Sequence, residues 1–92
     1  MEINLYATLR LIVGQKTIEV ELKPGANAQN LIEALVAKYP SMDPELLDKN
    51  RRLLPQMKMF INGREVIYLE NQFDYELRPD DTIDIFPPVG SG

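Results

Sequence analysis

The sequence predicts an α+β fold in which one mixed sheet of four to five strands carries a single main helix on one face. Apolar residues alternate with polar ones over 3–9 and again over 18–22, on either side of a turn at Gly14, which indicates an antiparallel hairpin. Over 28–39 the apolar residues recur every three to four positions, as is typical of an amphipathic helix. The dipeptide Asn62-Gly63 lies between two apolar runs and is a strong signal for a second hairpin.

The two alternating runs at the N-terminus are expected to form neighbouring strands. The first would extend from Ile3 to Leu9 and the second from Thr17 to Leu22, and Pro24-Gly25 would end the second strand. In each run every second side chain would face the core. These inward side chains are Ile3, Leu5, Ala7 and Leu9 in the first strand, and Ile18, Val20 and Leu22 in the second.

The predicted helix has clear limits. Asn27 can cap its N-terminus, and Pro40 would stop it because the residue before a proline is disfavoured in the helical region. Burial of each Leu or Ile of its apolar stripe would contribute about 1.5–3 kcal/mol, so the stripe is a large part of the core. The stripe comprises Ala28, Leu31, Ile32, Leu35, Val36 and Tyr39.

The second half of the chain supplies the remaining elements. Asp43-Pro44 can open a short helix, whereas residues 67–75 give no clear signal. Residues 77–81 predict a turn, and the adjacent acids Asp80 and Asp81 fit turn chemistry better than a metal site. A final strand follows at 82–86. Its alternation places Ile83 and Ile85 inward and Phe86 on the opposite face of the sheet.

The composition excludes several classes of function. The chain has 92 residues, enough for one domain, and contains no Cys and no His, so we expect no bound metal and no independent active site. A net charge of −4 without a basic run argues against nucleic-acid binding. The apolar runs are shorter than a membrane span, and the N-terminus does not resemble a signal peptide. We therefore expect a cytoplasmic protein that does not bind membranes.

The C-terminus carries the strongest functional signal. We expect a folded domain at 1–86 and a flexible tail at 87–92. Two prolines would keep the base of the tail extended, and the small residues would let its backbone pass close to partner atoms. An extended tail of this length spans roughly 20 Å at ~3.3 Å per residue. The tail consists of Pro87, Pro88, Val89, Gly90, Ser91 and Gly92.

Four segments together resemble the β-grasp, or ubiquitin-like, sulfur-carrier family. They are LYATLRLIVG at the start, PGANAQNLIEAL at the helix entry, MFINGREV at the middle hairpin and LRPDDTIDIFPPVGSG at the end. The resemblance covers essentially the whole chain, and the molybdopterin synthase small subunits are the most similar branch. The insertion at 41–56 and the FPP before the tail favour that branch over the more compact thiamine sulfur carriers.

This resemblance implies two-step chemistry at Gly92. A ubiquitin-activating-like adenylating enzyme would use ATP and Mg²⁺ to convert the Gly92 carboxylate into an acyl-adenylate, and sulfur would then replace AMP to give a thiocarboxylate. The thiocarboxylate would donate its sulfur in the large subunit of molybdopterin synthase, with which the chain would form a hetero-oligomer for molybdenum cofactor biosynthesis. The chain itself would bind no cofactor. Its partner-binding residues would be Phe86, Pro87, Pro88, Val89, Gly90 and Ser91, and Tyr6 could join the apolar docking patch formed by Phe86 and Val89.

One position departs from the family pattern. Family members end in Gly-Gly, whereas this chain ends Gly90-Ser91-Gly92. Either the partner accepts the serine, or the chain has lost carrier activity, or Gly-Ser-Gly is a linker foreign to the natural sequence. The alternative functions are a sulfur carrier for thiamine or tRNA thiolation, a ubiquitin-like protein modifier, and, from another class, a β-grasp interaction module without carrier activity.

Overall fold

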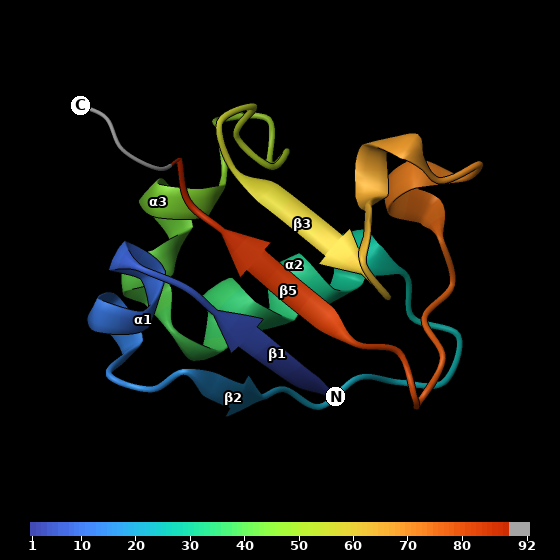
Figure 1. Ribbon diagram of the computed structural model, residues 1–92, viewed down its shortest axis with the longest axis horizontal. Helices are drawn as coiled ribbons and strands as arrows, with labels where there is room; N and C mark the ends of the chain where they lie inside the picture. The colour runs from blue at the N-terminus through green and yellow to red at the C-terminus, as the bar shows by residue number, and fades with distance from the viewer. Residues whose placement is uncertain (89–92) are drawn as a thin grey trace.

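In a computed structural model that describes residues 1–88, the chain forms a five-stranded mixed sheet with the order β2-β1-β5-β3-β4 (Figure 1). β1 and β5 are parallel, and the other neighbouring strands are antiparallel. This arrangement confirms the predicted mixed sheet with one main helix. The strands are β1 (Glu2–Leu5), β2 (Thr17–Glu19), β3 (Lys58–Ile61), β4 (Arg64–Glu65) and β5 (Ile83–Phe86).

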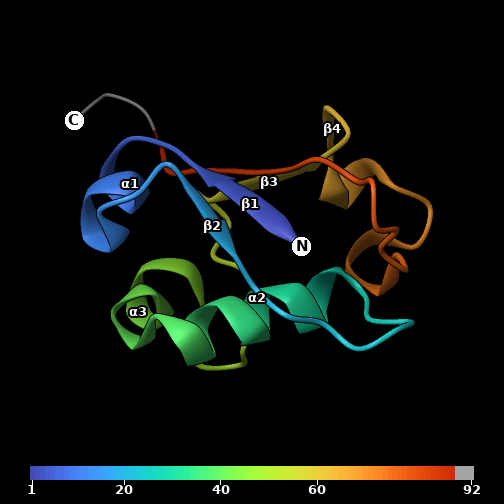
Figure 2. The same cartoon turned by 90° about the horizontal axis from the view of Figure 1, so that it is seen from below.

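The main helix, α2 (Ala28–Lys38), packs against one face of the sheet (Figure 2). The predicted cap at Asn27 is present, since its side chain accepts a 2.8 Å hydrogen bond from the Asn30 backbone N–H. Asn30 returns the contact by accepting from the Asn27 N–H at 2.9 Å. The two bonds complete a capping box that satisfies backbone donors at the helix start. The helix ends at Lys38, two residues before Pro40, as predicted.

The core lies between α2 and the sheet. From α2 it takes the predicted stripe except Tyr39, which is half-buried. From the sheet it takes alternate residues of the central strands, because successive side chains of a strand point to opposite faces. The inward sheet residues are Ile18 of β2, Ile3 and Leu5 of β1, Met59 and Ile61 of β3, and Ile83 and Ile85 of β5. The residues between them lie on the face opposite α2, which is called the open face below.

The prediction of a first strand from Ile3 to Leu9 is wrong beyond Leu5. Residues after β1 turn sharply at Ala7 (φ 52°, ψ −125°) and form a short helix, α1 (Thr8–Val13). Leu9 is buried as predicted, but it reaches the core from α1, and Ala7 is exposed. The apolar run at 11–13 breaks the alternation, so an extended strand there would present apolar side chains on both faces. Gly14, with φ 83°, ends the helix.

The remaining connections are short helical turns and one hairpin. Residues 40–46 form η1 (Pro40–Met42) and α3 (Asp43–Leu46), which confirms the short helix expected after Asp43-Pro44. The β3–β4 hairpin turns at Asn62 and Gly63, whose φ angles of 54° and 82° explain this pair of residues. The ambiguous segment 67–75 contributes to two 3₁₀ turns, η2 (Val66–Tyr68) and η3 (Gln72–Asp74). No helix within 1–88 is long and apolar enough to cross a bilayer.

Candidate functional site

Three aromatic side chains form a row on the open face. Phe86 lies opposite the inward Ile83 and Ile85, as predicted, and is half-buried. The Tyr6 ring stacks on it with 4.2 Å between ring centroids and 14° between ring planes. On the other side, Phe60 meets Phe86 edge-on, with centroids 5.5 Å apart and planes at 88°. Aromatic pairs favour both geometries. Tyr6, Phe86 and Phe60 are called the aromatic row below.

Strand register brings the aromatic row together. In the parallel β1–β5 pair, Leu5 is opposite Ile85, so the next position along each chain sets Tyr6 beside Phe86. In the antiparallel β3–β5 pair, Phe60 is opposite Asp84, which makes Phe60 a diagonal neighbour of Phe86 on the same face. The row therefore crosses from the end of β1 over β5 to β3. Its three members are far apart in the sequence.

A chain of hydrogen bonds runs beside the aromatic row. The Asp84 Oδ1 atom accepts from Asn4 Nδ2 at 3.0 Å and from the Tyr6 hydroxyl at 2.8 Å. Asn4 Oδ1 in turn accepts from Thr17 Oγ1 at 2.9 Å, so the chain links β2, β1 and β5. The hydrogen bond to Asp84, with partial burial and the nearby negative charge, raises the pKa of Tyr6 above its ordinary value. Tyr6 is thereby held as a proton donor to Asp84.

Phe86 of the aromatic row directly precedes the tail at 87–92, which is called the C-terminal segment below. Pro87, which follows Phe86 directly, is buried, and Pro88 is exposed. Gly92, predicted to carry the sulfur, and Val89, Gly90 and Ser91, predicted to contact the partner, lie outside the described residues. The structure thus places three of the seven predicted site residues, Phe86, Pro87 and Pro88, side by side at the end of β5.

Sequence reasoning missed two residues of this site and only suggested a third. The sequence suggests Tyr6 as a neighbour of Phe86 in an apolar patch, but it does not single out Asp84 or Phe60. The period-two alternation already placed Asp84 and Phe60 on the outward face of their strands. What it could not supply was the pairing of β5 with both β1 and β3, which makes them neighbours.

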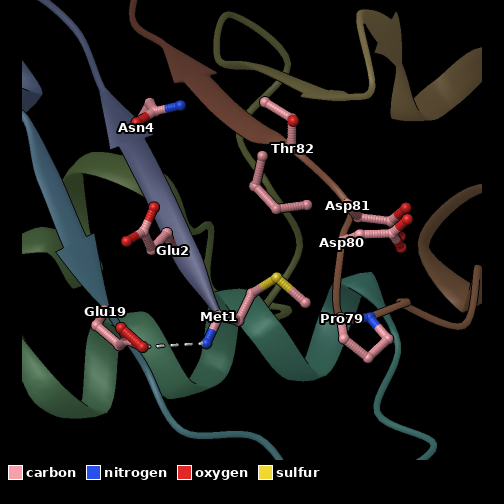
Figure 3. A pocket seen from close by; sticks show the side chains of 9 residues that line it. Met1, Glu2, Asn4, Glu19, Pro79, Asp80, Asp81 and Thr82 are labelled. Atoms are coloured by element: carbon pink, nitrogen blue, oxygen red, sulfur yellow. Dashed lines mark ion pairs between the residues drawn. The ribbon is translucent and has the colours of Figure 1, made fainter.

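A concave feature lies at the opposite end of β1 from the aromatic row. It is a depression of about 390 Å³ whose lining includes Glu2, Glu19, Asp80 and Asp81 (Figure 3). One of these acids, Glu19, lies 3.8 Å from the amino group of Met1. Within 1–88, no group of three or more acidic side chains is arranged to hold a metal ion. We therefore do not assign a ligand to this depression.

Asp81 has a structural role, as the turn prediction implies. Its Oδ2 accepts from the Tyr75 hydroxyl at 3.0 Å and from the Arg78 backbone N–H at 2.9 Å, and its Oδ1 accepts from Asn62 Nδ2 at 2.8 Å. Asn62 Oδ1 accepts from the Thr82 N–H at 2.8 Å. These bonds join the turn at 77–81 to the β3–β4 hairpin at the entry to β5. Asp81 thus fixes the start of the strand that ends at Phe86.

The fold and this C-terminal arrangement define a class of protein. This β-grasp fold is shared by the ubiquitin-like sulfur carriers and modifiers. The family model described as the ThiS family matches residues 3–92, so the chain belongs to the ThiS family. The match confirms the resemblance that the four sequence segments indicated.

Individual relatives agree with this assignment. The chain is 30% identical to small archaeal modifier protein 3 of Haloferax volcanii over 92 residues, covering 100% of this chain and 98% of that protein. A Pyrococcus furiosus structure, provisionally named molybdopterin converting factor subunit 1, is 27% identical with a TM-score of 0.74 and covers 96% of this chain and 95% of its own. A chain in the crystal structure of the BexX/CysO complex of Amycolatopsis orientalis is 21% identical, with a TM-score of 0.80 and coverage of 99% and 98%, and supports the fold.

Proposed function

We propose that the chain is a sulfur carrier, activated at Gly92 by an adenylating enzyme, that donates sulfur as a C-terminal thiocarboxylate in molybdenum cofactor biosynthesis. The observation that supports this most strongly is the aromatic row at the base of the C-terminal segment. It provides a docking surface directly beside the segment that would enter a partner. Membership of the ThiS family and the likeness to a molybdopterin converting factor subunit are consistent with the proposal.

The chemistry requires little of the chain beyond its carboxylate. A Gly92 oxygen attacks the α-phosphorus of ATP, pyrophosphate leaves, and an acyl-adenylate forms. Hydrosulfide then attacks the acyl carbon, AMP leaves, and the thiocarboxylate remains after loss of the sulfur-bound proton. Mg²⁺ in the activating enzyme would neutralise the phosphate charge during the first step. The chain contains no His or Cys, so the acid–base groups belong to the partner.

The aromatic row is suited to protein docking. Aromatic residues are enriched among the side chains that dominate binding energy at protein interfaces. Phe86 is half-buried in the free chain, and a partner that covered it would remove the rest of its apolar surface from water. The adenylating enzyme and the molybdopterin synthase large subunit both need the same C-terminal segment. They would therefore bind this chain in turn, and not together.

A second candidate function is protein modification. The 30% identity to small archaeal modifier protein 3 over the whole chain favours it. Activation of Gly92 would be the same, but the acyl group would pass to the amine of a target lysine and form an isopeptide bond. A carrier for thiamine or tRNA thiolation would differ only in the final sulfur acceptor. An interaction module without carrier activity would bind its partner equally well after removal of Ser91 and Gly92.

The intact mass of the chain tests the proposal. The purified chain is incubated with an adenylating enzyme of the ubiquitin-activating type, MgATP and a sulfide source. We expect a mass gain equal to exchange of one oxygen for sulfur, and no gain for a chain that lacks Gly92. If only a Ser91→Gly variant reacts, the fold supports activation but the native tail does not, and carrier function is refuted for this chain.

A further experiment separates the two pathways. The thiocarboxylate product is mixed either with a molybdopterin synthase large subunit and its sulfur-free pterin precursor, or with a cell extract and fresh MgATP. Loss of sulfur from the chain to the pterin supports the molybdenum cofactor pathway. Chain-sized mass increments on lysines of other proteins, without sulfur transfer to the pterin, would instead support the modifier function.

A further inference from the structure

Tyr6 lies just past the end of β1, yet it contacts two alternate residues of β5. Its ring stacks on Phe86, and its hydroxyl reaches back to donate a 2.8 Å hydrogen bond to Asp84. The parallel register, in which Leu5 is opposite Ile85, makes both contacts accessible to one side chain. Since Asp84 and Phe86 are two positions apart in a strand, their side chains lie on the same face. Tyr6 thus spans the outward face of β5 up to its last residue.

The Tyr6 ring is held by more than its stacking contact. The oxygen that accepts from its hydroxyl also accepts from Asn4 Nδ2 at 3.0 Å, and Asn4 is itself bonded to Thr17. Asp84 is therefore tied to β1 through Asn4 and to the residue after β1 through Tyr6, and Asn4 links β1 to β2. Rotation of the ring away from Phe86 would break a hydrogen bond to a charged acceptor, which is stronger than one between neutral groups. The acceptor group fixes the orientation of the ring.

The backbone next to Tyr6 carries strain. Ala7 has φ 52° and ψ −125°, a conformation that glycine adopts easily and alanine does not. Strain of this kind persists where the surroundings over-determine the backbone. Here Tyr6 is held over β5 on one side, and Leu9 is fully buried on the other. The turn at Ala7 lets the chain leave the sheet immediately after Tyr6 while the ring stays against Phe86.

We propose that Tyr6, oriented by Asp84, is the positioning residue of the C-terminal segment: it holds Phe86 in the rotamer that a partner contacts. The inference rests on the docking role proposed for Phe86. Phe60 packs against the opposite side of the Phe86 ring. Pro87, which follows Phe86 in the sequence, is buried. The direction in which the chain leaves the sheet is therefore fixed together with the position of Phe86. A docking side chain that is already ordered loses less entropy on binding.

Three variants separate the parts of this arrangement. Tyr6→Phe removes the hydroxyl and keeps the ring, Asp84→Asn removes the charge and keeps the shape, and Tyr6→Leu removes the ring. The matched control is Tyr68→Phe, at a tyrosine of η2 that is 72% exposed. The first readout needs no partner. It is the ring-flip rate of Phe86, measured by NMR on chain labelled in phenylalanine, of which the sequence contains three.

We expect Tyr6→Leu to raise the Phe86 flip rate about threefold to tenfold, the equivalent of one aromatic contact. Tyr6→Phe and Asp84→Asn should give smaller increases, and Tyr68→Phe none. Phe73 of η3, which is not part of the aromatic row, serves as an internal reference. An unchanged Phe86 flip rate in Tyr6→Leu would overturn the proposal, whatever the partner does.

The second readout is the KM of the adenylating enzyme for the chain, at a temperature where every variant is folded. We expect Tyr6→Phe and Asp84→Asn to raise KM about threefold to tenfold with little change in kcat, because binding and not chemistry is affected. If Phe86→Ala raises KM but these two variants do not, the positioning role is overturned and the docking role stands. If Phe86→Ala also leaves KM unchanged, both are overturned.

Discussion

Replacement of Asp81 tests whether its hydrogen bonds stabilise the turn that precedes β5. The carboxylate accepts three hydrogen bonds, from Tyr75, Arg78 and Asn62. In Asp81→Asn one acceptor oxygen becomes an NH₂ group. At least one of these hydrogen bonds is then lost, because two donor groups face each other. A hydrogen bond to a charged group contributes about 1.5–3 kcal/mol. Because Asp81 is partly exposed, solvent screening places the expected loss near the lower end of that range.

Urea unfolding at pH 7, followed by circular dichroism, measures this loss. We expect the free energy of unfolding to fall by about 1.5–2 kcal/mol in Asp81→Asn. Asp80→Asn is the matched control, because Asp80 is exposed and its substitution removes the same charge from the neighbouring position. Its effect should stay within about 0.5 kcal/mol. Equal effects of the two substitutions would show that charge, and not the hydrogen bonds, is responsible, which would refute this reasoning.

The pH dependence provides an independent check. Partial burial raises the pKa of Asp81, but the hydrogen bonds from the Arg78 N–H, Asn62 and Tyr75 more than offset burial, so the pKa lies below its ordinary value. The folded chain therefore binds this proton less readily than the unfolded chain. The stabilisation is complete above the unfolded pKa of about 3.9 and is lost as the pH falls through the folded pKa. The difference between wild type and Asp81→Asn should be constant from neutral pH to about pH 5 and should shrink below about pH 4.

Three further substitutions address the turn after β1, the core and the surface. Ala7→Gly should raise the free energy of unfolding by about 1 kcal/mol, because relief of the strain at φ 52° exceeds the entropy cost of glycine, and a lower urea midpoint would contradict this. Leu31→Ala, at a fully buried position of α2, should cost about 2–5 kcal/mol in the same assay, and a cost under about 1 kcal/mol would be inconsistent with the core described here. Arg51 forms surface ion pairs with Glu33 at 2.7 Å and with Asp43 at 2.6 Å. Arg51→Ala should therefore lower the thermal midpoint slightly at low salt and less at high salt. An effect that does not depend on salt would contradict a stabilising role of these ion pairs.

Much of the fold could be predicted from local patterns. The α2 stripe, its Asn27 cap and its end before Pro40 all follow from side-chain periodicity and backbone sterics, and the Asn62-Gly63 turn follows from the left-handed conformation that both residues tolerate. The segment after Leu5 could not be predicted in this way. Leu9 satisfies a strand pattern and a helix pattern equally well, because either places it against the core. The apolar run at 11–13 argues against a continuing strand but does not show where the strand ends, and only the turn at Ala7 sets that point.

The candidate site shows the same division. The sequence alone determined the identity of its parts: small residues after two prolines, and a Phe86 out of phase with Ile83 and Ile85. Their assembly was decided only by the tertiary structure. Tyr6 and Phe60 become neighbours of Phe86 because β5 inserts between β1 and β3. Periodicity is a local property of the chain, whereas strand pairing depends on burying the whole apolar face of the sheet at once, and that is a property of the complete fold.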